Sequence, residues 1–333
     1  MNSWIRGLAL AALVVAAAPV AAQQTVKIAT IAPDGSGWMK ELRAAAAEVQ
    51  TQTQGRVTVK FFPGGVMGSD TVVLRKIRLG QLQGGALTGS EIDSVCRDSP
   101  IYSLPFLFNS QDEVDAVRKI VDPMLADCFQ KNGQRLLGIA GGGFAYLMST
   151  HELRTRDDLR SSKVWVPAND RIGDQAFRNG GITPIPLPLS DVFTSLQTGL
   201  VDTVGNTPSG AVILQWHGKI KFVVDLPLTY IPAYILVDQK AMAKMTPADQ
   251  AAMQRAFSGA MNRIDAANRR ENVQALNAMK QGGTKVVTPP PAEAARWREI
   301  GITTANQLEQ KGTFTPGLLA TIRRTLAAKR GGK

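Results

Sequence analysis

Two hydrophobic periods alternate along the N-terminal part of the chain. Residues 25–30 and 57–62 alternate as strands do, whereas residues 38–52 repeat apolar side chains at helical spacing. A further helix, which we expect Asp70 to cap, leads into a short strand at 83–88. This order predicts an α/β fold with a largely parallel sheet, helices on both faces, and ligand sites beyond the carboxyl ends of the strands.

A second series of strands and helices follows further along the chain. The pattern predicts a strand at 163–166 and a helix at 172–179. The proline-rich segment 183–188 must be an edge strand or an extended connector, because proline has no amide hydrogen for a sheet. Ser190 is expected to cap the next helix, which leads into a short strand at 200–204.

The clearest helix of the chain begins near residue 246. Thr246 is suited to the cap position and Pro247 to the first turn, and the next strong helix breaker is Gly282. A helix of about 35 residues would be about 50 Å long at 1.5 Å per residue, which is more than one small lobe needs. We therefore expect this helix to span two lobes.

The N-terminus has the pattern of an export signal. Arg6 precedes an apolar run over residues 7–20, and small residues end this segment, so we place cleavage after Ala22. A membrane anchor is the alternative, but it usually needs about 20 apolar residues. We therefore predict that residues 1–22 are a signal peptide and that the mature chain is periplasmic.

The composition is that of a globular protein with a basic surface. The 333 residues are 44% hydrophobic and carry a formal net charge of +11. Lys and Arg are spread thinly except near the C-terminus, where we expect residues 326–333 to form a solvated basic tail. Aromatic residues make up only 6% of the chain, so we predict no nucleic-acid partner.

Two cysteines, Cys96 and Cys128, allow two interpretations. In an oxidising compartment an even pair can close a disulfide, and otherwise the two are buried thiols that pack as small apolar groups. The spacing does not decide between them, because a disulfide needs Cα atoms within about 7 Å.

Motifs for catalysis, cofactors or metals are missing from the sequence. The glycines at 141–143 fit neither a phosphate loop nor a dinucleotide fingerprint, and we interpret them as a close-approach loop. His151 and His217 have no metal-ligand spacing around them, and no GxSxG elbow occurs. We interpret four aspartates near the predicted cleft as caps or turn formers: Asp170, Asp174, Asp191 and Asp202. The expectation is a protein that is not an enzyme and has no cofactor.

Several segments together resemble a known family. They are the export-type N-terminus and residues 30–37, 103–108, 157–159, 163–167, 188–192 and 196–202. The most specific of them read Pro-Leu-Ser-Asp-Val, then Leu-Gln-Thr-Gly, then Val-Asp. The chain resembles the DctP family of substrate-binding proteins from tripartite ATP-independent periplasmic (TRAP) transporters, over nearly its whole mature length.

The resemblance implies an α/β, two-lobe type II periplasmic-binding-protein-like fold with hinge strands and a long helix touching both lobes. Lobe one would hold residues 24–142 plus 234–268, and lobe two residues 143–233 plus 269–325. The expected partners are a small-molecule ligand and the small and large integral membrane subunits, driven by an ion gradient. We expect the binding protein to be a monomer.

One departure from the family matters for the ligand. Family members typically hold a carboxylate with an arginine at the position of Trp165, and an indole cannot imitate that two-pronged donor. A second family arginine would fall near residues 144–146, which are Phe-Ala-Tyr here, whereas Asn206 does match the family. Alternatively, Arg171 or Arg178 swings into the cleft and replaces the clamp.

We therefore expect an aromatic pocket that suits a more apolar, cyclic or amphipathic ligand than a simple dicarboxylate. Each aromatic residue has the alternative of being a plain core residue. Another function open to the same fold is an accessory or sensing role in an efflux, envelope-lipid or signalling system. The expected ligand-binding residues are Trp165, Asn206, Tyr146, Phe144, Thr88, Asp170, Arg171, Leu189 and Trp216.

Overall fold

The computed structural model describes residues 23–88 and 92–331, so the expected signal peptide lies outside the described residues. One eight-stranded sheet runs through the molecule in the order β10-β8-β4-β9-β3-β1-β2, with β7 paired to β4, and β5 and β6 form a separate pair. The strands are β1 (Gln24–Thr30), β2 (Val57–Phe62), β3 (Gly84–Thr88), β4 (Gln134–Ser149), β5 (Trp165–Pro167), β6 (Ile185–Leu187), β7 (Thr203–Asn206), β8 (Phe222–Val224), β9 (Thr229–Asp238) and β10 (Lys285–Val287).

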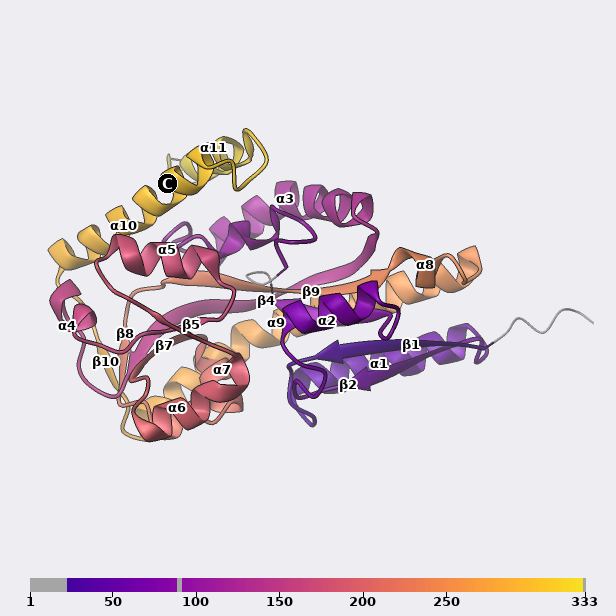
Figure 1. Ribbon diagram of the computed structural model, residues 1–333, viewed down its shortest axis with the longest axis horizontal. Helices are drawn as coiled ribbons and strands as arrows, with labels where there is room; N and C mark the ends of the chain where they lie inside the picture. Colours follow the sequence, from indigo (N-terminus) through magenta and orange to yellow (C-terminus); the bar gives the residue numbers. More distant parts are fainter. Residues whose placement is uncertain (1–22, 89–91, 332–333) are drawn as a thin grey trace, which may run out of the picture.

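The strand directions correct the prediction of a largely parallel sheet. β1 is parallel to β2 and β3, and β10 is parallel to β8. The long strands β4 and β9, however, pair antiparallel with each other, β9 also pairs antiparallel with β3, and β7 and β8 pair antiparallel with β4. The alternation of strands and helices predicted the crossovers within each half of the molecule, one half containing β1, β2 and β3 and the other β7, β8 and β10. It did not predict the long strands β4 and β9, which join these halves (Figure 1).

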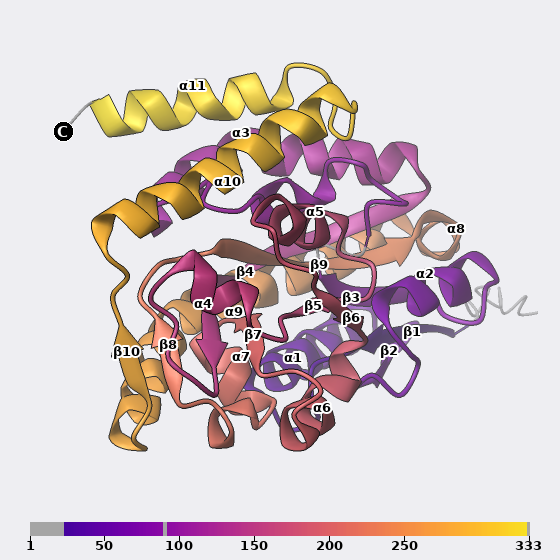
Figure 2. The same ribbon diagram turned by 60° about the vertical axis from the view of Figure 1, so that its left-hand side comes forward.

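Helices cover this sheet on both sides (Figures 1 and 2). Short 3₁₀ turns occur at Ser99–Ser103, Leu189–Asp191 and Trp216–Gly218. The α-helices are α1 (Gly37–Gln52), α2 (Asp70–Arg78), α3 (Gln111–Lys131), α4 (Arg156–Arg160), α5 (Arg171–Asn179), α6 (Val192–Thr198), α7 (Pro208–Ile213), α8 (Gln239–Met242), α9 (Pro247–Gln281), α10 (Pro291–Gln310) and α11 (Leu318–Gly331).

Two local predictions about helix caps are wrong. Ser69, not Asp70, occupies the N-cap position of α2, and the Asp70 carboxylate binds Thr88 instead. Ser190 lies inside a 3₁₀ turn, so α6 begins at Val192 with Asp191 before it. In both cases the polar side chain next to the helix start has a different neighbour, which sequence spacing does not reveal. The proline-rich strand β6 is confirmed as an edge strand, paired only with β5.

The long helix predicted from Thr246 is confirmed as α9, which has 35 residues. The Thr246 side chain accepts a hydrogen bond from the Asp249 amide at 3.1 Å, and Gly282 ends the helix. Phe257 packs in the apolar cluster beneath β1, whereas Met279 packs in the cluster around the β7 region. α9 therefore contributes to the cores of both halves (Figure 2).

The glycines at 141–143 lie within β4 and not in a loop. The pairing of β4 with β9 shifts register between them, and Gly143 has a φ of 109°. Their backbone is held by α9: the Gly141 amide donates to Asp265 at 2.7 Å, and Asn268 and Asn272 donate to the carbonyls of residues 141 and 142 at 2.7 Å each. The predicted close approach of another segment to these glycines is present, and that segment is the helix α9.

The apolar interior of the described residues consists of four clusters, and α9 and α10 each contribute to clusters in both halves. Two clusters gather around Phe129 and Phe257, and two others around Trp216 and Trp297. Where one lobe ends and the other begins stays a prediction. None of the helices within 23–88 and 92–331 is long and apolar enough to span a bilayer.

The C-terminal part differs from the expected tail. Residues 326–331 continue α11, Leu326 is buried, and Arg330 forms an ion pair with Glu113 of α3 at 2.8 Å. The apolar face of α11 packs in the same cluster as α3, which holds this segment on the molecule.

Cys96 and Cys128 form a disulfide, with Cα atoms 5.7 Å apart. Of the two interpretations that the sequence left open, the structure therefore has the cross-link. It joins the segment after β3 to the last turns of α3.

Candidate functional site

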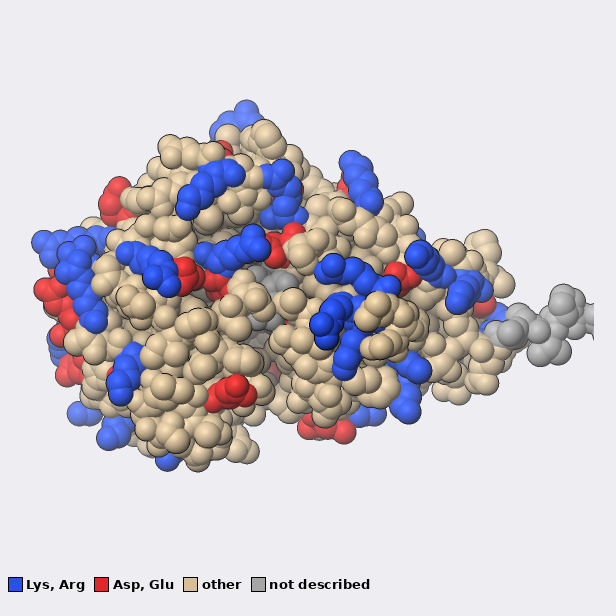
Figure 3. All heavy atoms as spheres, viewed as in Figure 1, with Lys and Arg blue, Asp and Glu red and all other residues tan. Residues whose placement is uncertain are grey.

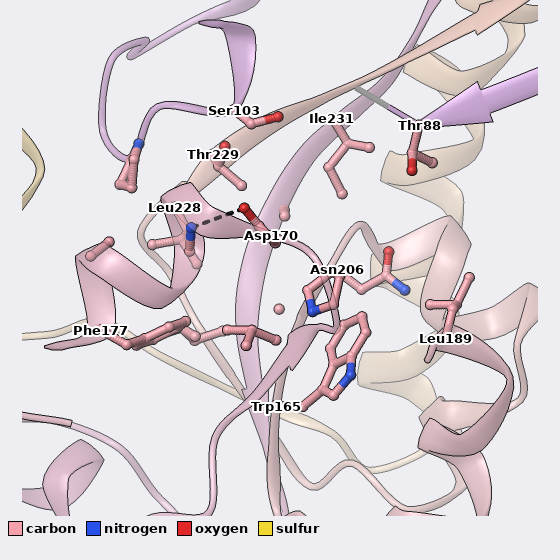
Figure 4. A pocket seen from close by; sticks show the side chains of 18 of the residues that line it. Thr88, Ser103, Trp165, Asp170, Phe177, Leu189, Asn206, Leu228, Thr229 and Ile231 are labelled. Atoms are coloured by element: carbon pink, nitrogen blue, oxygen red, sulfur yellow. Dashed lines mark hydrogen bonds between the residues drawn. The ribbon is translucent and has the colours of Figure 1, made fainter. Parts of the chain in front are cut away.

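A cavity of about 560 Å³ lies between the two halves. Its lining comes from the loops before α2 and after β3, from the ends of β4, β5 and β9, and from α5 and α10. Most of these side chains are apolar, with a few polar ones among them (Figure 4). This combination of an apolar wall and a few polar groups is typical of small-molecule sites.

Asp70 and Thr88 form a polar pair at one end of the cavity. Oδ2 of Asp70 accepts from the Thr88 amide at 2.6 Å and from the Thr88 hydroxyl at 2.7 Å. Its other oxygen, Oδ1, is buried and has no hydrogen-bond partner among the described residues. Burial raises the pKa of Asp70 to about 6, against the lowering effect of the hydrogen bonds from Thr88.

Trp165 offers the cavity only an apolar surface. Its indole N–H already donates to the Leu187 carbonyl at 2.9 Å, and its ring packs edge-on against Trp216 with centroids 5.4 Å apart. Leu189 and Asn206 lie beside it (Figure 4). The Asn206 Oδ1 accepts from the Thr207 amide at 2.8 Å, and its Nδ2 has no partner within the described part of the chain.

Asp170 is both a cap and a lining residue. It occupies the N-cap position of α5, where its Oδ1 accepts from the Gly173 amide at 3.0 Å (Figure 4). Burial raises the pKa of Asp170 to about 6. The interpretation of this residue as a cap is confirmed, and it also lines the cavity, where it was expected among the ligand-binding residues.

The opposite end of the cavity reaches into the core of the second half. Phe177 and Leu228 line it (Figure 4), together with Trp297 and Ile300 of α10. The Thr229 hydroxyl and the Trp297 indole N–H are buried there without a partner in the described residues. Arg156, the first residue of α4, also lines the cavity.

The expected site residues divide into two groups. Thr88, Trp165, Asp170, Leu189 and Asn206 line the cavity together, although they come from both halves. The remaining four do not line it: Phe144, Tyr146, Arg171 and Trp216.

Strand alternation explains why Phe144 and Tyr146 lie elsewhere. In β4 the side chains of Ala145 and Leu147 line the cavity, so their neighbours point away from it. Phe144 packs on Tyr230 with ring centroids 5.4 Å apart, and Tyr146 packs against the cluster that holds Trp216. Phe144, Tyr146 and Trp216 thus support the walls and are not part of their surface.

Neither alternative arginine replaces the family's clamp in this structure. The Arg171 side chain is 85% exposed and lies 3.8 Å from Asp93, and Arg178 pairs with Asp174 at 2.8 Å. Neither belongs to the cavity lining. Trp165 and Ala145 therefore line the cavity where the resemblance places guanidinium groups.

The lining residues that sequence reasoning missed include Asp70, Arg156 and Trp297. Asp70 carried no distinguishing signal, since an acid in the first turn of a helix is favoured by the helix dipole wherever it points. Arg156 and Trp297 carried none, because they reach the cavity from α4 and α10, which the tertiary fold alone brings together.

The chain is similar to several known proteins. It is 25% identical over 291 residues to the C4-dicarboxylate-binding periplasmic protein DctP of Rhodobacter capsulatus, covering 85% of each chain. It is 24% identical over 252 residues to the 2,3-diketo-L-gulonate-binding periplasmic protein YiaO of Escherichia coli, covering 72% of this chain and 74% of that one.

Solved structures of TRAP periplasmic solute-binding proteins share its two-lobe fold. The protein from Desulfovibrio salexigens with bound orotic acid superposes with a TM-score of 0.84 at 20% identity, over 92% of this chain and 99% of that one. The protein from Xanthobacter autotrophicus with bound β-D-galacturonate gives 0.83 at 21% identity, over 91% and 99%. The family model for bacterial extracellular solute-binding protein, family 7, named DctP, matches residues 28–311. The chain therefore belongs to this DctP family of extracellular solute-binding proteins.

Proposed function

We propose that the chain is a periplasmic receptor that captures a small organic molecule in the cavity between its halves and delivers it, unchanged, to the small and large membrane subunits of a TRAP transporter. The cavity itself is the observation that carries this proposal, because its lining comes from both halves. Binding proteins of this build close around their ligand by hinge motion, so the affinity depends on how much better the closed state holds the ligand than the open state does.

The comparisons support import over an efflux or sensing role. Relatives are named for the acids that they bind, and the similar structures with bound orotic acid and galacturonate are TRAP proteins. In keeping with a periplasmic receptor, we propose that residues 1–22 are an export signal and that the mature chain acts as a monomer.

Surface charge supports a receptor without a nucleic-acid partner. On the face shown in Figure 3, Lys and Arg side chains lie scattered over both halves with Asp and Glu among them. A nucleic-acid interface instead gathers its cations on one face or along one helix.

The ligand, in this proposal, is more apolar or cyclic than a short dicarboxylate. Trp165 presents only carbon surface, because its N–H is bound within the protein, and Ala145 presents a methyl group. A dicarboxylate needs paired donors for each charged end, and a desolvated charge without them is costly.

Thermal unfolding with a panel of solutes tests the receptor function and this choice of ligand. A solute at 100 times its dissociation constant adds about 2.7 kcal/mol to the free energy of unfolding, which raises the Tm measurably. We expect aromatic and cyclic acids to raise the Tm more than succinate or malate. Strong shifts with short dicarboxylates alone would refute the apolar-ligand proposal, and no shift with any small solute would count against the receptor itself.

Trp165→Arg tests the place of this side chain in the site. For the best solute of that panel we expect at least about tenfold weaker binding, because a guanidinium brings an unpaired charge into an apolar wall. Trp165→Phe is the matched control and should keep most of the affinity. Unchanged affinity in Trp165→Arg would remove this residue from the site.

A further inference from the structure

Buried polar atoms without a partner gather at the cavity. Four side-chain nitrogen or oxygen atoms in the described residues are buried without a hydrogen bond, and three of them belong to residues that line this cavity. They are Oδ1 of Asp70, Oγ1 of Thr229 and Nε1 of Trp297. Leaving such an atom unpaired is unfavourable, so a ligand that supplies the partner should bind at least about tenfold tighter than one that does not.

Asp70 and Trp297 belong to opposite ends of the cavity. Asp70 binds Thr88, which Figure 4 places far from Phe177. Trp297 packs in the same apolar cluster as Phe177. One turn further along α10, Ile300 lies close to Gly180, the residue that ends α5 just after Phe177. The two residues that carry these unpaired groups therefore line opposite ends of one cavity.

The two ends offer opposite hydrogen-bonding chemistry. An ionised Asp70 offers only an acceptor, whereas an indole N–H only donates. Arg156 adds a second donor near Trp297. Its backbone amide donates to the Glu293 carboxylate at 3.1 Å, and Glu293 lies one helical turn before Trp297 on α10. Among the described residues that line the cavity, Arg156 is the only cation.

Between these ends the wall is apolar. The apolar residues of the lining include Trp165, Leu189, Leu147, Phe177 and Leu228. Such a surface favours a flat or cyclic carbon body, because enclosing that body removes its apolar surface from water.

Resting on the proposed function, we propose that the ligand is an elongated molecule with a ring-containing apolar body, an N–H or O–H donor at one end that meets Asp70, and a carboxylate or similar acceptor at the other end that meets Trp297 and Arg156. The ligand acid is thus held at the α10 end of the cavity, and the wall that carries Trp165 contacts the carbon body.

Four compounds separate the parts of this proposal. They are 3-(4-aminophenyl)propionate, its methyl isostere 3-(4-methylphenyl)propionate, 4-propylaniline, which lacks the acid, and succinate. The dissociation constants are measured by calorimetry at pH 7.5. The amino propionate should bind at least about tenfold tighter than its methyl isostere, because the two differ in the hydrogen bond to Asp70 and hardly in size.

Asp70→Asn assigns the donor end. An asparagine oxygen still accepts from Thr88 while the amide N–H₂ replaces the unpaired oxygen, so an acceptor becomes a donor without a change of shape. The preference for the amino over the methyl compound should disappear, with the affinity for the methyl compound unchanged. A preference that survives in Asp70→Asn would overturn the assignment.

Arg156→Gln and Trp297→Phe assign the acid end. Each should weaken both propionates by about tenfold and leave 4-propylaniline unaffected. The matched controls are Arg154→Gln, an exposed residue outside the cavity, and Trp38→Phe, a half-buried tryptophan outside it. Equal losses for 4-propylaniline would mean that the variants only disturb packing, and the acid end would then be wrong.

The outcome of this panel is distinguishable from failure of the receptor function. If succinate binds most tightly, or none of the three aromatic compounds binds, the ligand class is wrong and a receptor for another solute remains. Failure of every solute in the wider thermal panel is the result that counts against the receptor.

Discussion

Asp70 shows how a single residue can favour binding over stability. It is 2% exposed, one carboxylate oxygen holds Thr88, and the other has no partner among the described residues. An ionised carboxylate in such a position is costly, since burial removes its water without full replacement. The ligand-free protein therefore carries a poorly solvated charge at the point where we propose that the ligand donates a hydrogen bond.

The pH dependence of stability follows from this burial. The pKa of Asp70 is about 6 in the folded chain against an ordinary 3.8, so between about pH 4 and 6 the folded state holds a proton that the unfolded state has lost. The free energy of unfolding therefore falls as the pH rises through this interval and levels off above it. The shift corresponds to about 1–3 kcal/mol.

Asp70→Asn should remove this effect. We expect the ligand-free variant to be more stable than the wild type by about 1–3 kcal/mol at pH 7.5, with the difference shrinking as the pH falls to 4. Urea unfolding at pH 4, 5 and 7.5 measures it, with the exposed Asp112→Asn as control. Burial also raises the pKa of Asp170 to about 6, so the free energy of unfolding of the variant should still fall somewhat as the pH rises from 4 to 6. Equal free energies of unfolding at pH 7.5 would show that the buried charge of Asp70 does not destabilise the folded state.

At the scale of single residues, the sequence predicted which residues lie near the cavity better than it predicted which way their side chains point. Thr88, Trp165 and Asn206 reach the cavity because they lie at the ends of strands whose order the sequence indicates. Phe144 and Tyr146 do not, since a shift of one position along β4 turns a side chain to the other face. A resemblance that placed an arginine near residues 144–146 did not say which of the three points inward.

At the scale of elements, the pairing of β4 with α9 is the most specific feature. The helix side chains Asp265, Asn268 and Asn272 follow one face of α9 and bind successive backbone groups of Gly141 and Gly142, two of the three glycines at 141–143. Side chains on these glycines would collide: a Cβ at position 143 would lie 2.5 Å from Nδ2 of Asn272. The absence of side chains lets the helix lie directly on the strand.

Two glycine substitutions should therefore act in opposite directions. Gly143→Ala should lower the free energy of unfolding by about 1–3 kcal/mol, because it adds the collision to a φ of 109°. Gly259→Ala, within α9 and only 3.4 Å from a flexible Arg263 terminus, should raise it by about 0.5–1 kcal/mol. Urea denaturation compares them. A Gly143→Ala variant as stable as the wild type would contradict the close packing.

The elements were predictable where they carry their own start and stop signals. Thr246, Pro247 and Gly282 fix α9 because capping and proline chemistry act locally. β4 was not predictable as one 16-residue strand, because three consecutive glycines look like a break when the supporting side chains come from a helix that is distant in the sequence. The same non-local cause hides the true cap of α2.

For the whole molecule, several shared elements join the halves. β4 and β9 run through the common sheet, and α9 packs in clusters of both halves. Neither half can unfold without exposing part of the other's core. The two-lobe architecture followed from the family resemblance, whereas the antiparallel centre of the sheet depends on long-range pairing that no local pattern carries.

We therefore expect thermal unfolding of the ligand-free protein to be a single transition. Scanning calorimetry should give equal calorimetric and van't Hoff enthalpies, since the shared elements couple the halves. A bound solute should move this one transition upward as a whole. Two resolved transitions, of which the solute moves only one, would show that the halves unfold independently.

The cross-link between Cys96 and Cys128 has a practical consequence for anyone who makes this protein. Its 32-residue separation corresponds to about 3–4 kcal/mol of chain entropy removed from the denatured ensemble. Bacterial cytoplasm keeps thiols reduced, so protein produced there lacks this contribution to the free energy of unfolding, whereas protein folded in an oxidising compartment has it. The route of expression thus sets the reference against which every melting curve of this receptor is interpreted.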